Sequence, residues 1–362
     1  MAGLPLADRV ALAAMVRNRF GTRAPALIET TLLRRRADTK LPHAQGWLFT
    51  DEALQQATAT PVARHRAQRL TGRVVHDATC SIGTELAVLR ETAAAAVGSD
   101  IDPVRLAMAR HNLGDTVLLC RADALRPVTA HAVVVIDPAR RSGGARRFDP
   151  TAYLPPLDQV LEVYRGRDLV VKCAPGIDFE ALAELGFTGE IEVTSLEGSV
   201  REACLWSPGL ATARRRATVL DTGEQFTDAD PDDCPVAAVG RWIVDPDGAV
   251  VRAGLVRHYA TRHGLWQLDP DIAYLTGETV PPGERGFEVL EQLPFTEKKL
   301  RQALSALDCG ALEILVRGVG VDPDALRRRL RVKGSSPLSV VITRIGTGSA
   351  SRATAFVCRP SW

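Results

Sequence analysis

The chain of 362 residues contains no apolar run long enough to cross a bilayer, and no short apolar core with a cleavage site at its N-terminus. Its seven cysteines are scattered and include no C-x-x-C pair, which argues against a structural zinc site and a disulfide framework. The seven histidines are also dispersed, without metal-ligand spacing. These absences predict a protein with no metal and no membrane association, whose reduced thiols indicate the cytoplasm.

The charge of the chain is nearly balanced overall but unevenly distributed. The formal net charge of +2 does not by itself indicate a binding partner. The N-terminal part carries Arg34–Arg36, and residues 281–362 contain 13 Lys and Arg against 8 Asp and Glu. Basic ends around a neutral middle suit a polyanion such as RNA, although each cluster also fits an ordinary solvated helix face.

Periodicity divides the chain into four parts. Residues 1–70 show helical spacing in Ala7–Arg19, in Ala24–Arg36 and in a third segment, Asp51–Arg69, which contains Pro61. Residues 71–211 alternate strand and helix patterns, which predicts a mostly parallel sheet covered on both faces. Residues 212–285 predict a small mixed region, and residues 286–362 a βαβαββ module. The length of 362 residues predicts two or three domains, and no repeat of 20–50 residues is present.

The most informative stretch is a short apolar strand, Val74–Asp77, that enters a turn of small residues and then a helix. The turn includes Thr79, Cys80 and Gly83, and a second strand ends about twenty residues later at Asp100-Ile101. An acid in that position can accept hydrogen bonds from ribose hydroxyls, while a tight turn lets the backbone approach a ligand. The spacing therefore predicts a site for an adenosine-containing cofactor.

Two more acids follow at the ends of the next two predicted strands. Asp123-Ala124 follows the third strand, and Asp137-Pro138-Ala139-Arg140 follows the fourth. The order of these four elements resembles that of class I S-adenosylmethionine methyltransferases. A NAD-dependent dehydrogenase, the nearest competitor, requires G-x-G-x-x-G at the first turn, where this chain has Thr79 and Ser81. Cys80 with Gly83-Thr84 is instead similar to the D-x-x-C-G-x-G-T variant of RNA-modifying methyltransferases.

The resemblance implies a role for each of these elements. The turn would hold the methionine end of S-adenosylmethionine, through Asp77, Thr79, Cys80 and Gly83. Asp100 and Ile101 would contact the ribose, and Asp123 and Ala124 the adenine. Asp137, Pro138 and Arg140 would lie beside the transferred methyl group, as the candidate catalytic residues.

The methyl acceptor is left open by the sequence. The Asp137–Arg140 run is similar both to the D/N-P-P-Y/F pattern of base N-methylation and to the D-P-P-R pattern of pyrimidine C5 methylation. The first needs an aromatic ring, for which Phe148 and Tyr153 are candidates. The second needs a thiolate, for which Cys173 is a candidate, although it is also explained as a small core residue.

Several neighbouring polar residues carry two interpretations each. Lys172 fits either a phosphate contact or a strand cap, and Glu202 fits either a base-edge contact or a salt bridge. The arginines around Gly143-Gly144 form either a phosphate-binding lip or an ordinary loop; they are Arg140, Arg141, Arg146 and Arg147.

Taken whole, the chain resembles a bacterial, actinobacterial-type family of class I methyltransferases that end in a THUMP-like domain. The resemblance rests on Arg34–Arg36, Asp137–Arg141, Lys172–Gly176 and the tail Leu338–Arg344. It implies an α/β fold: a Rossmann-like core, an N-terminal helical region and a small C-terminal α+β domain. THUMP domains of related enzymes bind tRNA, so it also implies an RNA substrate.

The expected function is therefore S-adenosylmethionine-dependent methylation of a base in tRNA or rRNA. Two alternatives are a methyltransferase for a protein or small molecule, and a catalytically inactive RNA-binding protein. The sequence gives no indication of the oligomeric state.

Overall fold

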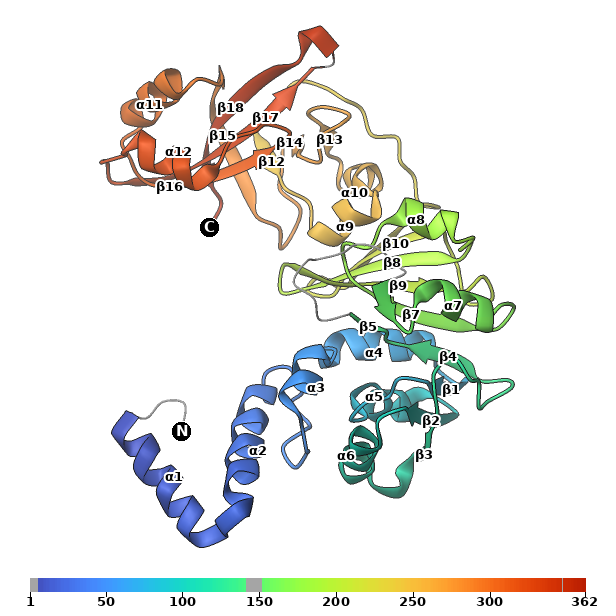
Figure 1. The fold of residues 1–362 in the computed structure, drawn as a ribbon. Helices are drawn as coiled ribbons and strands as arrows, with labels where there is room; N and C mark the ends of the chain where they lie inside the picture. Colours follow the sequence, from blue (N-terminus) through green and yellow to red (C-terminus); the bar gives the residue numbers. More distant parts are fainter. Residues whose placement is uncertain (1–5, 141–151, 347) are drawn as a thin grey trace. The chain divides into compact units, whose positions relative to one another are not determined.

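The computed structural model describes residues 6–140, 152–346 and 348–362, which form two compact units (Figure 1). Of these residues, the first unit comprises those up to 196 and 200–214, and the second comprises 197–199 and those from 215 onward. Within the described ranges, no helix is both long enough and apolar enough to span a membrane.

The first unit begins with helices. These are α1 (Leu6–Phe20), α2 (Ala24–Ala37), α3 (Asp51–Gln56) and α4 (Thr60–Arg69). The predicted segment Asp51–Arg69 is thus two helices. Thr50 caps α3 by accepting a hydrogen bond from the Ala53 amide, and the chain is extended at Ala59 before α4 begins at Thr60, with Pro61 in its first turn. Pro61 removes a backbone donor and is tolerated only in a first turn, which explains the break.

A twisted sheet follows, with strand order β8-β9-β7-β4-β1-β2-β3 within the first unit. The bounds are β1 Val74–Asp77, β2 Ala95–Asp100, β3 Leu118–Arg121, β4 Val133–Ile136, β7 Leu169–Cys173, β8 Glu190–Leu196 and β9 Ser199–Trp206. Strands β3, β2, β1, β4 and β7 are parallel, and β9 is antiparallel to β7. The parallel part brings the carboxyl ends of these strands to one edge, where the predicted acids lie.

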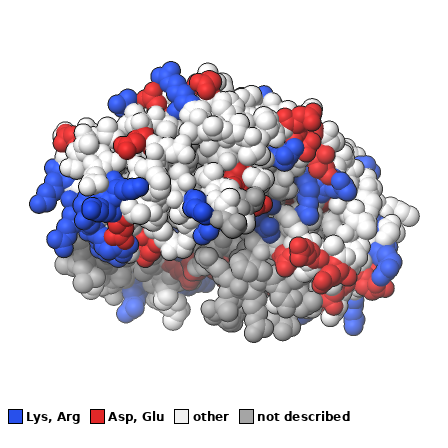
Figure 2. Space-filling model, turned by 90° about the horizontal axis from the view of Figure 1, so that it is seen from above, with Lys and Arg blue, Asp and Glu red and all other residues white. Residues whose placement is uncertain are grey.

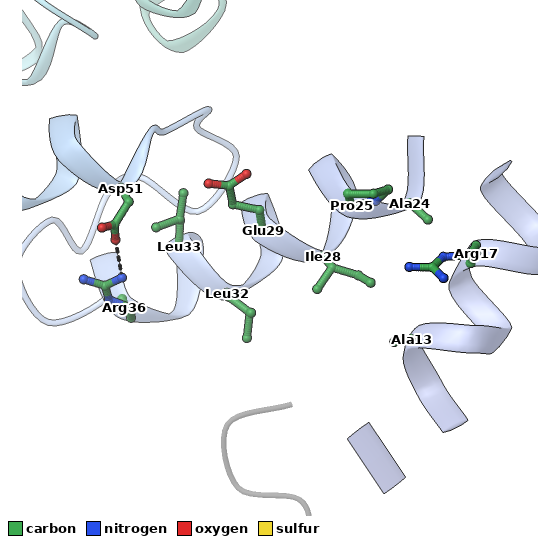
Figure 3. A pocket seen from close by; sticks show the side chains of 10 residues that line it. All are labelled: Ala13, Arg17, Ala24, Pro25, Ile28, Glu29, Leu32, Leu33, Arg36 and Asp51. Carbon is green, nitrogen blue, oxygen red and sulfur yellow. Dashed lines mark hydrogen bonds and ion pairs between the residues drawn. The ribbon is translucent and has the colours of Figure 1, made fainter. Parts of the chain in front are cut away.

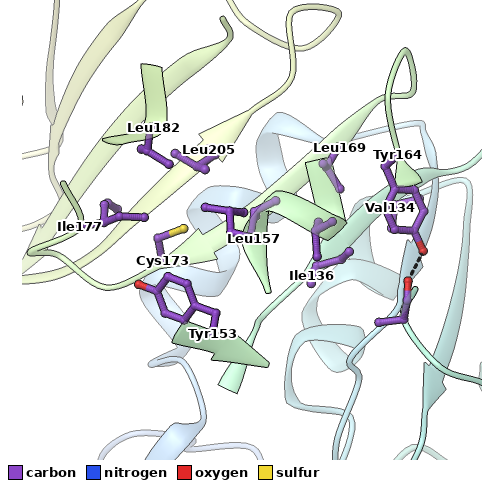
Figure 4. Packing of buried hydrophobic residues seen from close by; sticks show 14 of the residues in the cluster. Val134, Ile136, Tyr153, Leu157, Tyr164, Leu169, Cys173, Ile177, Leu182 and Leu205 are labelled. Carbon is purple, nitrogen blue, oxygen red and sulfur yellow. Dashed lines mark hydrogen bonds between the residues drawn. The ribbon is translucent and has the colours of Figure 1, made fainter. Parts of the chain in front are cut away.

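Both faces of this sheet are covered. Residues of α4 and of α5 (Thr84–Thr92) pack on one face against β1, β4 and β7. On the other face, α7 (Leu157–Val163) and α8 (Phe179–Glu184) enclose an apolar cluster (Figure 4). Helix α6 (Pro103–Leu113) connects β2 to β3, and a short ribbon pairs β5 (Ala139–Arg140) with β6 (Tyr153–Leu154). The predicted α/β, Rossmann-like core is confirmed.

The second unit is built on a sheet of order β13-β14-β12-β15-β18-β17-β16. Its strands are β12 Trp242–Val244, β13 Trp266–Gln267, β14 Leu275–Gly277, β15 Gly286–Pro294, β16 Cys309–Arg317, β17 Ser336–Ile345 and β18 Arg352–Pro360. Strands β10 (Arg215–Val219) and β11 (Glu224–Thr227) form an antiparallel pair.

Two pairs of helices belong to this unit. Helices α9 (Gly248–Ala253) and α10 (Val256–His263) follow β12. Helices α11 (Glu297–Ala306) and α12 (Pro323–Leu330) contribute to one apolar cluster with β15 to β18. The side chains of Thr296 and Asp322 cap α11 and α12. The predicted order βαβαββ is therefore present from β15 to β18.

Candidate active site

A cavity of about 460 Å³ opens at the carboxyl ends of β1 to β4 and β7. This volume lies in the range of roughly 300–1,000 Å³ that is usual for small-molecule sites. Five carboxylates line it: Asp77, Glu85, Asp100, Asp123 and Asp137. Only two cations, Lys172 and Arg105, line it among the described residues. The cavity is thus rich in hydrogen-bond acceptors and negative charge.

The turn after β1 follows a constrained path although it lacks the usual glycines. Ser81 has a φ of 48°, in the left-handed region that non-glycine residues seldom adopt. Its amide donates a hydrogen bond to Asp100 Oδ2 at 2.9 Å, which offsets the conformational cost. Gly83 has a φ of 89°, and a Cβ there would lie 2.7 Å from Leu113 Cδ1. Glycine is therefore required at 83 by backbone conformation and by helix packing.

Asp100 lies at the end of β2 and is held by backbone amides. Its Oδ1 accepts from the Asp102 amide at 2.9 Å, while Oδ2 accepts from Ser81. Asp102 does not share this task, because its carboxylate caps α6 by accepting from the Val104 amide. Asp100 thus fixes two loops of the cavity wall and keeps further lone pairs for a ligand.

Asp77 is buried beneath the same turn. Its Oδ1 accepts from the Thr79 amide at 3.1 Å. Burial, with repulsion from Glu85, raises the pKa of Asp77 to about 8. Thr79 also connects two predicted elements, since its Oγ1 accepts from the Asp137 amide at 2.7 Å.

A buried ion network lies behind the cavity. Arg66 of α4 donates to both oxygens of Glu85, from Nε at 2.7 Å and from Nη2 at 3.0 Å, and also bonds Glu202. Lys172 of β7 places Nζ 2.5 Å from Asp137 Oδ2 and 3.9 Å from Glu85 Oε2. Burial opposes the charged form of Glu85, but Arg66 and Lys172 outweigh it and lower the pKa of that carboxyl. Lys172 therefore contacts a site carboxylate, an arrangement that neither sequence-based interpretation included.

The N-terminal helices also contribute to the cavity, which the sequence did not indicate. Ala53, Gln56 and Ala57 of the α3 segment are lining residues. Glu52 of the same helix forms an ion pair of 3.0 Å with Arg105 of α6. The Asn112 side chain exchanges hydrogen bonds with both backbone groups of Leu48 and so ties this segment to α6. Ion pairs and hydrogen bonds between segments this far apart produce no local pattern in the sequence, so the sequence analysis could not have predicted them.

The structure brings most, but not all, of the predicted cofactor-site residues to the cavity. The lining includes Asp77, Thr79, Cys80, Asp100, Ile101, Asp123, Ala124 and Asp137. Gly83 and Pro138 do not line it; Gly83 lies at the start of α5, and Pro138 is buried while Ala139 lines the cavity instead. Arg140 pairs through its backbone with Tyr153, and its side chain lies outside the described part of the structure. Arg141, Arg146, Arg147 and Phe148 also fall outside the described residues.

Three candidates for acceptor chemistry lie elsewhere. Cys173 is 7% exposed, belongs to the apolar cluster beside α7 and α8 and does not line the cavity (Figure 4). Tyr153, the suggested stacking ring, is buried in the same cluster, and its hydroxyl accepts from the Ala174 amide. Glu202 is buried against Arg66 and so takes the salt-bridge alternative.

A second hollow, of about 350 Å³, lies between α1 and α2 (Figure 3). Ile28, Leu32 and Leu33 line it together with Arg17 and Arg36. Arg36 bonds Asp51 at its edge, at 2.5 Å. It contains none of the predicted site residues.

The residues at the strand ends fit S-adenosylmethionine. Its ribose hydroxyls and adenine amino group are donors, for which Asp100 and Asp123 are acceptors. Its sulfonium and ammonium groups are cationic, and the carboxylate-rich lining compensates positive charge. Among the described residues, no group of His, Cys, Asp and Glu has the arrangement of a metal site.

Comparison with known proteins agrees with this chemistry. Two proteins of Mycobacterium tuberculosis, from strains CDC 1551 and H37Rv, are each named uncharacterized S-adenosylmethionine-dependent methyltransferase. Each is 71% identical to this chain over 357 residues, which is 96% of this chain and 100% of theirs. A family profile described as THUMP domain-like matches residues 284–360.

A solved structure extends the likeness to the fold. A protein of Porphyromonas gingivalis W83, assigned as a methyltransferase, has a TM-score of 0.77 and 19% identity, covering 99% of this chain and 100% of that one. The mycobacterial relatives match this chain at high identity over nearly the full length of both proteins, which is enough to show the family. The chain belongs to the S-adenosylmethionine-dependent methyltransferases, with a THUMP-like domain at its C-terminus, and is an enzyme that uses S-adenosylmethionine.

Proposed function

We propose that this enzyme methylates a base in RNA, in tRNA or rRNA, and that its C-terminal domain contributes to RNA binding. The observation that carries the proposal is a basic surface on a domain that matches the THUMP-like family. We call this surface the α11–α12 patch; it consists of Lys298, Lys299, Arg328, Arg331 and Lys333, all exposed. Figure 2 shows Lys and Arg gathered at the left of the view, the side on which α11 and α12 lie in Figure 1.

The α11–α12 patch is available to a polyanion because its side chains are not used within the fold. Within the described ranges, no hydrogen bond or ion pair engages the side chains of its five residues. Adjacent arginines have structural partners instead: Arg327 donates to the Leu312 carbonyl, and Arg329 pairs with Glu297. The latter contact, with Arg301 on the Arg329 carbonyl, joins α11 to α12 and holds the patch together. Unpaired cations on a fixed surface are typical of phosphate contacts.

The cavity residues take the following roles in the proposal. Asp77 and the Thr79–Ser81 turn hold the methionine end of the cofactor, Asp100 with Ile101 the ribose, and Asp123 with Ala124 the adenine. Asp137 borders the methyl group that the cofactor supplies when bound. Cys80 is the only cysteine that lines the cavity in the described part of the chain, and burial raises the pKa of its thiol. Nitrogen is therefore the favoured acceptor, because carbon-5 methylation needs an accessible thiolate.

Transfer of a tritiated methyl group from S-adenosylmethionine tests the proposal. Total RNA from a strain lacking this gene is the acceptor, and RNA from the parent strain is the control. We expect label in the first RNA and little in the second, followed by a methylated nucleoside in mass spectrometry. With whole-cell extract of the deletion strain as the acceptor instead, label in the protein or small-molecule fraction would favour a methyltransferase for a protein or small molecule. RNA binding without any transfer would favour the inactive RNA-binding protein.

A further inference from the structure

Lys172 is the cation placed against the carboxylate that borders the transferred methyl group. It lies in β7 and is 8% exposed, and its Nζ is 2.5 Å from Asp137 Oδ2. We infer that Lys172 is a positioning residue for methyl transfer, which engages Asp137 through Oδ2 and leaves Oδ1 available to the methyl acceptor. This inference rests on the proposed role of Asp137.

The two ends of the Lys172–Asp137 pair lie in different surroundings. The Lys172 side chain is 9% exposed, whereas that of Asp137 is 40% exposed, and both residues line the cavity. Water can therefore still reach the Asp137 carboxylate, whereas the Lys172 side chain has little contact with solvent. Here the lysine is enclosed and the carboxylate faces the space that a substrate enters.

Asp137 is fixed at two points and free at a third. Its amide donates to Thr79 Oγ1 at 2.7 Å, which sets the backbone, and Lys172 sets the carboxylate. Oδ1 has no hydrogen-bond or ion-pair partner in the described part of the structure. A carboxylate oxygen in that state can accept one N–H from an acceptor nitrogen and so orient its lone pair.

Glu85 is a more distant partner of Lys172 than Asp137 is. Arg66 already binds both oxygens of Glu85, and Lys172 is 3.9 Å from the nearer of them. Burial opposes the charge on Lys172, and Asp137 is the group that most strongly stabilises that charge. The closest and strongest partner of the lysine is thus the site carboxylate rather than the network behind it.

A double-mutant cycle tests the inference. The variants are Lys172→Met, Asp137→Asn and the double variant, with Lys172→Arg as the charge-conserving control. Single-turnover transfer of tritiated methyl into RNA from the deletion strain is the readout. We expect Lys172→Met to lower the rate by roughly 100-fold, the scale of losing the orientation of a reacting group. Lys172→Arg should recover part of that loss, because it restores a cation beside Asp137.

The cycle distinguishes positioning from general structural support. If Lys172 acts through Asp137, the double variant should be within about 3-fold of Asp137→Asn alone, since effects of residues that act as a unit do not add. Fully additive losses would overturn the inference. Calorimetry with S-adenosylhomocysteine should give affinities for Lys172→Met within about 3-fold of the wild type. A loss of that affinity as large as the loss of rate would make Lys172 a cofactor ligand and would also overturn it.

One measurement is independent of the RNA substrate. In a crystal structure of Lys172→Met with S-adenosylhomocysteine, we expect the Asp137 carboxylate to leave the position that it has in the wild-type crystal structure. A carboxylate in the same place in both would contradict the inference. Absence of label from RNA with the wild-type enzyme would instead contradict the proposed function, and the crystallographic comparison would still decide the role of Lys172.

Discussion

Arg66 and Glu85 form a two-pronged ion pair behind the cavity, with donor–acceptor distances of 2.7 and 3.0 Å. Both side chains are almost fully buried, so removing one leaves the other without compensation. We expect Arg66→Met to lower the free energy of unfolding by about 3–5 kcal/mol at neutral pH. Urea unfolding of the variant and the wild type measures this difference.

The same pair predicts a pH dependence. Because the pKa of Glu85 is lowered on folding, its stabilising contribution is present above its unfolded value of 4.5 and is lost as the pH falls through the lower folded value. The difference in free energy of unfolding between Arg66→Met and the wild type should therefore become smaller at acidic pH. A difference of equal size at pH 7 and pH 4 would contradict this account.

The contribution of Asp77 to stability depends on pH in the opposite direction to that of Glu85. Burial and Glu85 raise its pKa from 3.8 to about 8, so the folded protein binds a proton that the unfolded chain releases. Its contribution to stability is complete below the unfolded pKa and is lost as the pH rises toward 8. Asp77→Asn keeps an acceptor for the Thr79 amide but does not ionise. Between pH 6 and pH 9, we expect the free energy of unfolding, measured in urea, to fall less for this variant than for the wild type. An equal fall in both proteins would show that Asp77 of the wild type is already ionised at pH 6, which would contradict the raised pKa.

Asp100 should be needed for cofactor binding. Replacing a carboxylate that accepts hydrogen bonds from a ligand removes about 1.5–3 kcal/mol, so Asp100→Ala should weaken S-adenosylmethionine binding by roughly 10- to 100-fold. Asp100→Asn is the control, because its carbonyl still accepts one of the amides of Ser81 and Asp102. Calorimetry measures both. Unchanged affinity in Asp100→Ala would remove this residue from the site.

The α11–α12 patch should determine part of the salt dependence of RNA binding. Lys298→Glu with Arg328→Glu should weaken binding to bulk tRNA and reduce the slope of log affinity against log salt by about one for each phosphate that is no longer neutralised. Arg257→Glu, an exposed arginine of α10 that pairs with Asp232, is the matched control. Filter binding at several salt concentrations gives the slopes. A slope equal to that of the wild type would exclude the patch from RNA binding.

Cys173 should be dispensable for methyl transfer. It packs among apolar side chains away from the cavity, so Cys173→Ala should retain activity within a few-fold of the wild type. The readout is tritium incorporation into RNA from the deletion strain. Complete loss of transfer, with cofactor affinity and unfolding curves unchanged, would indicate a thiolate mechanism at carbon-5 and contradict the nitrogen acceptor.

The sequence predicted correctly those structural features that depend on residues close together in the chain. The strand ends that carry Asp77, Asp100, Asp123 and Asp137 were predicted correctly, because a parallel sheet must bring its carboxyl ends to one edge. The helical pattern of Asp51–Arg69 is present with the expected ends, but it is divided into two helices because Pro61 is tolerated only in the first turn of the second one.

The sequence by itself determined the order of strands and helices and the acids that end the strands, since both follow from periodicity and from the short-range rules of turns. Only the tertiary structure decided which cation meets which carboxylate. Arg66 and Glu85 are 19 residues apart, and Lys172 and Asp137 are 35 apart. Such pairs form because the fold brings distant segments together and a buried charge, such as that of Arg66, Glu85 or Lys172, needs an opposite charge beside it. The spacing of residues along the chain does not show which elements become neighbours.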